Sequence, residues 1–257
     1  MTLSAEQRAT LAARLRAGRR AVDTAPRGPI LDIGPGDGPP LYAVHAVGGT
    51  VHGYAPLAVA LAGAYSVKGI EASADPPASL AEMADRYAAL IRAAGPGPYR
   101  LLGWSMGGVV AYETAVRLGA DVADLIQVDA PYLTPLSYAD TAVELAALFV
   151  RDAGGTPSGS TVDDLLDSLG QGMRAEIERR FAVFTAHTSL LAGYRPRQRL
   201  GCRALLFRAA GSPDSATSYA RMIDGPVRVV DLSADHYACL LPPAVAEIAT
   251  AIQTFAE

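Results

Sequence analysis

Residues 99–118 read "YRLLGWSMGGVVAYETAVRL", in which a serine among small residues separates an apolar run from an amphipathic one. Gly103 and Gly107 stand two positions to either side of Ser105 and complete the G-x-S-x-G pattern of a nucleophile elbow. Such an elbow needs small neighbours because the chain turns sharply from a buried strand into a helix. The stretch therefore predicts a strand over 99–104, a nucleophilic Ser105 and a helix after it. The alternative is an ordinary glycine-rich turn with a capping serine, which this context disfavours.

Short apolar runs recur on both sides of the elbow and alternate with amphipathic segments such as 79–94. Their residues are apolar on both alternating faces, which is typical of strands buried between two layers of helices. The runs cover residues 41–47, 65–70, 99–104, 124–130, 203–209 and 227–232. This order of elements predicts an α/β fold with a mostly parallel sheet flanked by helices.

The alternation breaks between about residues 134 and 200. This stretch carries three helical patterns and no convincing strand, at 137–153, 161–169 and 173–194. We interpret it as an all-helical insertion within a single domain that spans residues 39–257.

Residues 1–38 precede this domain. Leucine and alanine recur at helical spacing over residues 4–19, with arginines on the other face. The following "DTAPRGPILDIGPGDGPP" (23–40) is too rich in Pro and Gly for regular structure. The segment therefore predicts a helical leader and a linker.

The composition excludes several classes of protein. The net charge is -4 and the 22 basic residues are scattered, so we expect no nucleic-acid partner. The 2 cysteines lie far apart and outside any metal-ligand spacing, so neither a disulfide framework nor a metal site is expected. No signal peptide or long apolar stretch is present, which predicts a cytoplasmic protein without membrane segments.

A serine hydroxyl needs an oriented base to act as a nucleophile, and the chain has 4 histidines. His45 and His52 precede the serine, and His187 lies in the helical insertion. His236 follows the last predicted strand, in "SADHYACLLPP" (233–243), at the carboxyl edge of the sheet where Ser105 also lies. Its late position fits the order serine, acid, histidine, which makes His236 the candidate base.

The third member of such a triad is a carboxylate. Asp129 ends the strand after the nucleophile helix, and Asp214 follows the next strand. Asp235 is adjacent to the histidine in sequence, and side chains of adjacent residues usually point apart. Asp231 lies inside a predicted strand. Position alone leaves Asp129 and Asp214 as equal candidates.

Two backbone N–H groups are candidates for stabilising an oxyanion. The N–H of Met106 lies at the start of the predicted helix, directly after the serine. The loop "HAVGGTVHGY" (45–54) follows the first strand, and its paired glycines allow a close approach to substrate. Val47 is then the second donor, although an ordinary glycine turn explains the same pattern.

With these pieces the chain resembles the thioesterase domains of non-ribosomal peptide synthetases and polyketide synthases, over about residues 40–256. The resemblance rests on five segments, "HAVGG" (45–49), "GWSMGGVVAYETA" (103–115), "QVDAP" (127–131), "FAVFTAHTSLLAGYRP" (181–196) and "DHYACLLPP" (235–243). Tryptophan before the serine is typical of domains that release a finished chain, whereas free-standing editing thioesterases more often carry histidine there. Both a separate protein and one domain of a synthetase are compatible with this resemblance.

The resemblance implies an α/β-hydrolase fold with a helical lid inserted after the strand that bears the acid. It favours Asp129 over Asp214 as that acid, beside Ser105 and His236, with Met106 and Val47 as oxyanion donors. It also implies an acyl or peptidyl substrate on the phosphopantetheine of a carrier protein, with no metal and no diffusible cofactor. The product is a free acid or a macrocycle.

Three rival functions remain at this point. A free-standing type II thioesterase would clear misloaded carrier proteins, and a serine esterase would act on small molecules without a carrier. An inactive hydrolase-like module would bind without catalysis.

Overall fold

The computed structural model describes residues 30–73, 75–135, 139, 141–153, 155, 161, 162, 166 and 171–256. The predicted leader and most of the predicted helix at 161–169 lie outside these residues.

The described residues form a seven-stranded sheet with the order β1-β3-β2-β4-β5-β6-β7. Its strands are β1 (Ile30–Asp32), β2 (Pro40–Val44), β3 (Ser66–Ile70), β4 (Tyr99–Trp104), β5 (Val122–Val128), β6 (Arg203–Arg208) and β7 (Val227–Asp231). Strands β2 to β7 run parallel, and β1 pairs antiparallel with β3. The predicted α/β fold with a mostly parallel sheet is confirmed.

Two predictions about the first strands are wrong. The segment read as an irregular linker contains β1, because the short apolar run at 30–32 pairs with the open edge of β3. The glycines around it permit close packing, since a Cβ on Gly36 would lie 2.0 Å from the carbonyl oxygen of Tyr65. The strand predicted at 41–47 ends at Val44, where the chain leaves the sheet and enters the glycine loop.

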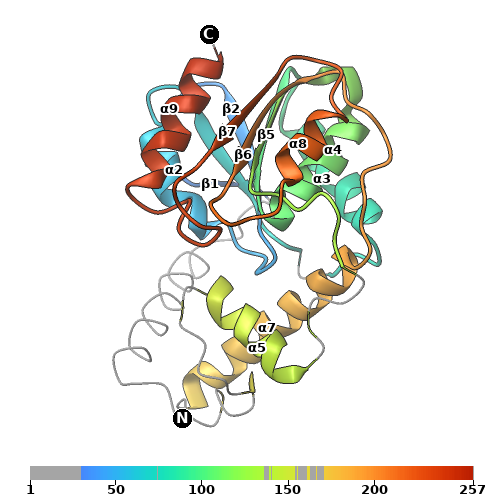
Figure 1. Ribbon diagram of the computed structural model, residues 1–257, viewed down its shortest axis with the longest axis vertical. Coiled ribbons are helices and arrows are strands. Elements are labelled where there is room, and N and C mark those ends of the chain that lie inside the picture. Colours follow the sequence, from blue (N-terminus) through green and yellow to red (C-terminus); the bar gives the residue numbers. More distant parts are fainter. Residues whose placement is uncertain are drawn as a thin grey trace.

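Helices cover both faces of the sheet (Figure 1). One face is covered by α3 (Leu80–Ala94), α4 (Met106–Leu118) and α8 (Ser215–Ala220), and the other by α2 (Ala55–Ala60) and α9 (Ala244–Ala256). Short 3-10 helices, η1 (His52–Tyr54) and η2 (Gly119–Asp121), precede α2 and follow α4. Each layer buries its own apolar cluster, so the strands between them are apolar on both sides.

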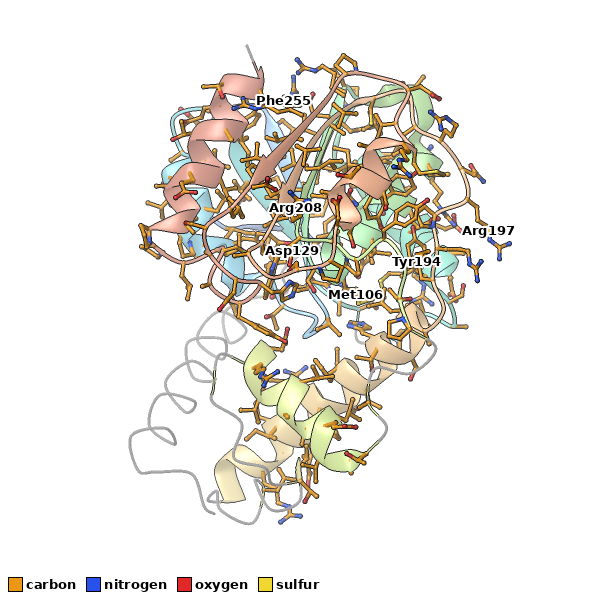
Figure 2. All side chains as sticks on the ribbon, in the orientation of Figure 1. Met106, Asp129, Tyr194, Arg197, Arg208 and Phe255 are labelled. Atoms are coloured by element: carbon orange, nitrogen blue, oxygen red, sulfur yellow. The ribbon has the colours of Figure 1, made fainter. Side chains whose placement is uncertain are left out.

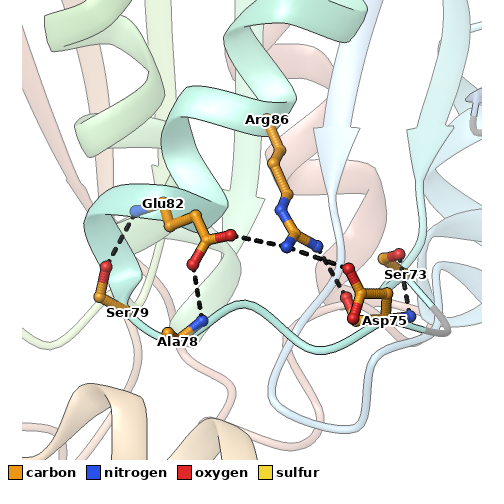
Figure 3. A network of polar contacts seen from close by, with 6 residues as sticks. All are labelled: Ser73, Asp75, Ala78, Ser79, Glu82 and Arg86. Atoms are coloured by element: carbon orange, nitrogen blue, oxygen red, sulfur yellow. Dashed lines mark hydrogen bonds and ion pairs between the residues drawn. The ribbon is translucent and has the colours of Figure 1, made fainter.

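A polar network determines where α3 begins (Figure 3). The Ser79 hydroxyl accepts a hydrogen bond from the Glu82 N–H at 3.1 Å, and the Glu82 carboxylate accepts one from the Ala78 N–H at 2.8 Å. The Arg86 guanidinium forms ion pairs with the carboxylates of Glu82, at 2.6 Å, and Asp75, at 3.1 Å. An N-cap of this kind stabilises a helix by about 1 kcal/mol. The network thereby anchors α3 just after the strand β3.

Between β5 and β6 the described helices are α5 (Ala142–Asp152) and α7 (Gln171–Leu191), which lie beyond one end of the sheet (Figure 1). They bury a small apolar cluster of their own, in which the rings of Phe181 and Phe184 pack against Phe149. We refer to α5 and α7 together as the lid.

Candidate active site

The elbow at Ser105 is a sharp turn between β4 and α4. Ser105 has φ 56° and ψ -128°. This positive φ lies in the left-handed region, which residues other than glycine rarely adopt. A Cβ on Gly103 would lie 2.1 Å from the carbonyl oxygen of Gly107, and one on Gly107 would lie 2.4 Å from that of Val44. Both glycines of the motif are therefore required by packing, and the strained backbone holds the serine above the sheet.

His236 and Asp129 form a hydrogen-bonded pair at the same end of the sheet. The Nδ1 of His236 donates to Oδ2 of Asp129 at 2.7 Å. Asp129 also accepts from the hydroxyl of Ser212 at 2.7 Å and from the N–H of Ala209 at 3.0 Å. Burial alone would raise the pKa of Asp129, but these three donors outweigh it and leave the pKa below its ordinary value. Asp129 is therefore an ionised, well-anchored partner for the imidazole.

Trp104 contacts both the backbone and the ring of His236. Its indole N–H donates to the backbone carbonyl of His236 at 3.1 Å, and the two ring centroids are 5.2 Å apart. With Nδ1 bound to Asp129 and the ring packed on Trp104, the imidazole is fixed in orientation and Nε2 is its basic nitrogen.

The structure does not bring the other candidate acids to the histidine. Asp214 caps α8 by accepting from the Thr217 N–H at 3.2 Å, and it pairs with Arg208 at 3.0 Å. The hydrogen bond from Thr217 lowers the pKa of Asp214. Asp235 accepts from the N–H groups of the next turn, at 3.0 Å and 2.9 Å. Asp231 pairs with Arg208 at 2.7 Å.

A cavity of about 270 Å³ lies between this end of the sheet and the lid, and Ser105, Asp129 and His236 all contribute to its wall. Figure 2 shows Asp129 and Met106 at the end of the sheet that faces α5 and α7. The rest of the wall is mainly apolar, with Leu133, Leu148, Phe184 and Leu191 among its residues. Within the described residues no hydrogen bond joins the Ser105 hydroxyl to His236. Such bonds are often long in a ligand-free hydrolase and tighten with substrate.

Val47 and Met106 line the same cavity. In the described part of the chain, neither of their backbone N–H groups donates an intramolecular hydrogen bond. Met106 is the first residue of α4, where the helix dipole also favours a negative charge. Both N–H groups are thus available to an oxyanion beside Ser105.

Two histidines determine the geometry of the Val47 loop. The Nδ1 of His45 lies 2.7 Å from the carbonyl oxygen of Ala46, and the Nδ1 of His187 lies 2.8 Å from that of Val47. The two rings are stacked with centroids 4.9 Å apart. Burial lowers the pKa of His45 to about 3 and holds that of His187 below its ordinary value, so both are neutral donors. The Ala46 carbonyl shares a peptide plane with the Val47 N–H, so its hydrogen bond with His45 also fixes the direction of that N–H, and the bond from His187 holds the adjoining peptide.

Sequence reasoning missed the roles of His187 and Ser212. His187 lies on a lid helix more than a hundred residues from the loop it binds, and no local pattern indicates that contact. Ser212 follows β6 at the carboxyl edge of the sheet, which was a weak signal for a site residue. His45, which the order along the chain sets aside as the base, makes a hydrogen bond to the loop instead.

No described helix is both long enough and apolar enough to span a bilayer. No cluster of three or more His, Cys, Asp or Glu residues in the described ranges is arranged to hold a metal ion.

Comparison with known proteins identifies the class. A sequence model of the thioesterase domain family matches residues 39–254. The dimodular nonribosomal peptide synthase of Bacillus subtilis (strain 168) is 28% identical over 245 residues, which cover 83% of this chain and 10% of that protein. The chain therefore spans only a small part of the length of this relative.

Two solved thioesterase domains share the fold. The Vlm2 thioesterase domain bound with a dodecadepsipeptide superposes with a TM-score of 0.65 and 25% identity, over 89% of this chain and 98% of that chain. The NocB thioesterase domain, in a covalent complex with a fluorophosphonate analogue, gives a TM-score of 0.67 and 24% identity, over 89% and 99%. The architecture is that of an α/β-hydrolase, as expected. The chain belongs to the thioesterase domain family, which confirms the resemblance seen in its sequence.

Proposed function

We propose that the chain releases an acyl or peptidyl group from the phosphopantetheine thioester of a carrier protein, through an ester on Ser105. The observation that carries this proposal is the 2.7 Å hydrogen bond between His236 and Asp129, in the wall of the cavity that Ser105 enters from a strained elbow. Family membership and the similarity to a peptide synthase support the thioester substrate and the carrier. The proposed reaction requires no metal and no diffusible cofactor.

In the first step the Ser105 hydroxyl attacks the thioester carbonyl, and Nε2 of His236 takes its proton. The negative charge that forms on the carbonyl oxygen accepts hydrogen bonds from the N–H groups of Met106 and Val47. Loss of one such donor raises the barrier by about 3 kcal/mol. The intermediate then expels the phosphopantetheine thiolate, which receives the proton from His236 and leaves the acyl group on the serine.

Asp129 keeps its charge throughout this cycle. Its hydrogen bond holds Nδ1 protonated, so that Nε2 faces the serine as a base, and its negative charge stabilises the imidazolium. The lowered pKa of Asp129 fits this role, since it keeps the carboxylate ionised beside the imidazole at neutral pH.

In the second step another nucleophile loses a proton to His236 and attacks the acyl ester. The bond between the acyl carbon and the Ser105 oxygen then breaks, and that oxygen takes the proton back from His236. Water gives a free acid, and a hydroxyl or amine of the acyl chain gives a lactone or a lactam. The apolar wall contributed by the lid limits access of water to the ester.

The test is Ser105→Ala, assayed with an acyl thioester of N-acetylcysteamine and with an acyl-loaded carrier protein. We expect turnover to fall by at least a thousandfold, with substrate binding retained. Ser189→Ala, at an exposed position on α7, is the matched control and should keep full activity. Undiminished turnover by Ser105→Ala would show that Ser105 is not the nucleophile.

The substrate distinguishes the rival functions. Mass spectrometry of the products from a panel of carrier-linked acyl and peptidyl chains separates hydrolysis from cyclisation. A preference for short acyl groups over peptidyl chains would favour an editing thioesterase. Efficient hydrolysis of nitrophenyl esters, together with no response to a carrier protein, would favour a small-molecule esterase.

A further inference from the structure

The cavity wall contains a carboxylate that the proposed mechanism does not use. Asp152 is the last residue of α5, and its side chain lines the cavity together with Ser105 and His236. It lies directly against the loop of Val47, since a Cβ on Gly48 would be 2.3 Å from Oδ2 of Asp152. Among the described residues, no hydrogen bond or ion pair within 4 Å involves this carboxylate.

The surroundings of Asp152 disfavour its ionised form. Desolvation by burial raises its pKa to about 6, against the opposing effects of His236 and Arg180, so the group is mainly ionised at neutral pH. Arg180 is held by Glu176, and His236 by Asp129. The negative charge of Asp152 therefore faces the same space in which a thioester oxygen would become negative.

A cation carried by the substrate would give the Asp152 carboxylate a hydrogen-bond partner and would also neutralise its charge near the oxyanion. The N–H groups of the ammonium would donate hydrogen bonds to the half-buried carboxylate, and its positive charge would offset the effect of that carboxylate on the oxyanion. The other lid residues of the wall, such as Leu148, Phe184 and Leu191, bear no charge. Among the described lid residues that line the cavity, Asp152 is therefore the one that offers a charge to a bound acyl chain.

We propose that Asp152 binds a protonated amine of the acyl group, so that the substrate class is an aminoacyl or peptidyl thioester with an ammonium near its reacting carbonyl. Gly48 adjoins Val47, whose N–H would hold the carbonyl oxygen, so the amine belongs to the residue whose carbonyl reacts. An α-amine or the side-chain amine of the terminal residue fits this spacing. This inference rests on the proposed function of the same site.

The test compares N-acetylcysteamine thioesters that differ only in an amine. One pair is leucyl and 4-methylpentanoyl, and the other is Nα-acetyl-lysyl and Nα-acetyl-norleucyl. For Asp152→Asn we expect a tenfold or larger fall in kcat/KM with at least one amine-bearing thioester, and no fall with its amine-free partner. Glu247→Gln, an exposed change on α9, is the control for loss of one negative charge.

Binding in the Ser105→Ala background keeps the result separate from the chemistry. Calorimetric titration with the same thioesters should show the amine-bearing member binding at least tenfold more weakly when Asp152→Asn is added. Equal effects on both members of each pair would overturn the proposal, whether activity rises or falls. If Ser105→Ala retained turnover, the proposed mechanism would fail, while selective loss of amine binding would still support the role of Asp152. Should Asp152→Asn fold poorly, Asp152→Ser serves for the same comparison.

Discussion

The elbow and the lid contribute opposite walls of one cavity, but different forces define them. At the elbow, backbone contacts determine the position of every reacting atom, as the closeness of Gly103 to Gly107 and of Gly107 to Val44 demonstrates. The lid has its own small apolar cluster, and side-chain contacts such as that of His187 with Val47 join it to the sheet. In the proposed mechanism the nucleophile therefore lies on a turn fixed by backbone packing, while the acyl group meets a layer that side chains hold in place.

The largest effect expected at the elbow end is loss of the acid. Asp129→Asn should lower kcat by about 10⁴-fold, because an amide neither holds Nδ1 of His236 protonated nor stabilises the imidazolium. Asp214→Asn, which keeps a capping side chain on α8 but removes the ion pair with Arg208, should alter kcat by less than about twofold and slightly lower stability. Steady-state kinetics of the two variants measures the difference. Equal losses would contradict the assignment of Asp129.

A second change tests whether backbone packing defines the elbow. Gly107→Ala places a methyl group 2.4 Å from the Val44 carbonyl oxygen and should destabilise the fold by about 3 kcal/mol or more. Gly201→Ala is the control, because its Cβ would meet no atom within 4 Å. Urea denaturation measures the free energy of unfolding of both variants. A free energy of unfolding unchanged in Gly107→Ala would mean that the elbow tolerates rearrangement.

The contrast between the two regions explains what could be predicted from sequence. The glycine spacing around Ser105 is a local signal, because the steric requirement that it meets involves neighbouring residues. Strand β4 and the start of α4 therefore lie where the pattern placed them. The position of His236 after the last strand could be inferred in the same way from the order of elements along the sheet.

The remaining features depend on residues that are distant in sequence. Position alone could not separate Asp129 from Asp214, because both follow strands at the same edge; only the fold shows which one reaches the histidine. Strand β1 was missed because three residues among glycines and prolines carry no periodicity, and its stability comes from pairing with β3. The contact of Asp152 with Gly48 joins the end of α5 to the loop that follows β2, and hydrophobic periodicity gives no information about it.

On the lid side, the half-buried carboxylate of Asp152 should affect the pH dependence of stability. Its folded-state pKa is raised to about 6, so ionisation weakens the fold as the pH rises from about 4 to 6. Asp152→Asn lacks this penalty and should be more stable than wild type above pH 6, by roughly 1 to 3 kcal/mol, with the gain vanishing near pH 4. Thermal unfolding across pH measures it, with exposed Glu247→Gln as the control. A gain independent of pH would contradict the assignment.

The smallest expected effect concerns the link between lid and elbow. His187→Phe keeps an aromatic ring against His45 but removes the hydrogen bond to the Val47 carbonyl, which helps to orient the oxyanion loop. We expect kcat to fall by about tenfold with little change in KM, because loosening a donor affects the transition state more than the bound thioester. His52→Phe, on the short helix η1, is the matched control. An increase in KM with kcat unchanged would show instead that His187 shapes the substrate cavity, and would place this residue with the selecting lid and apart from the reacting elbow.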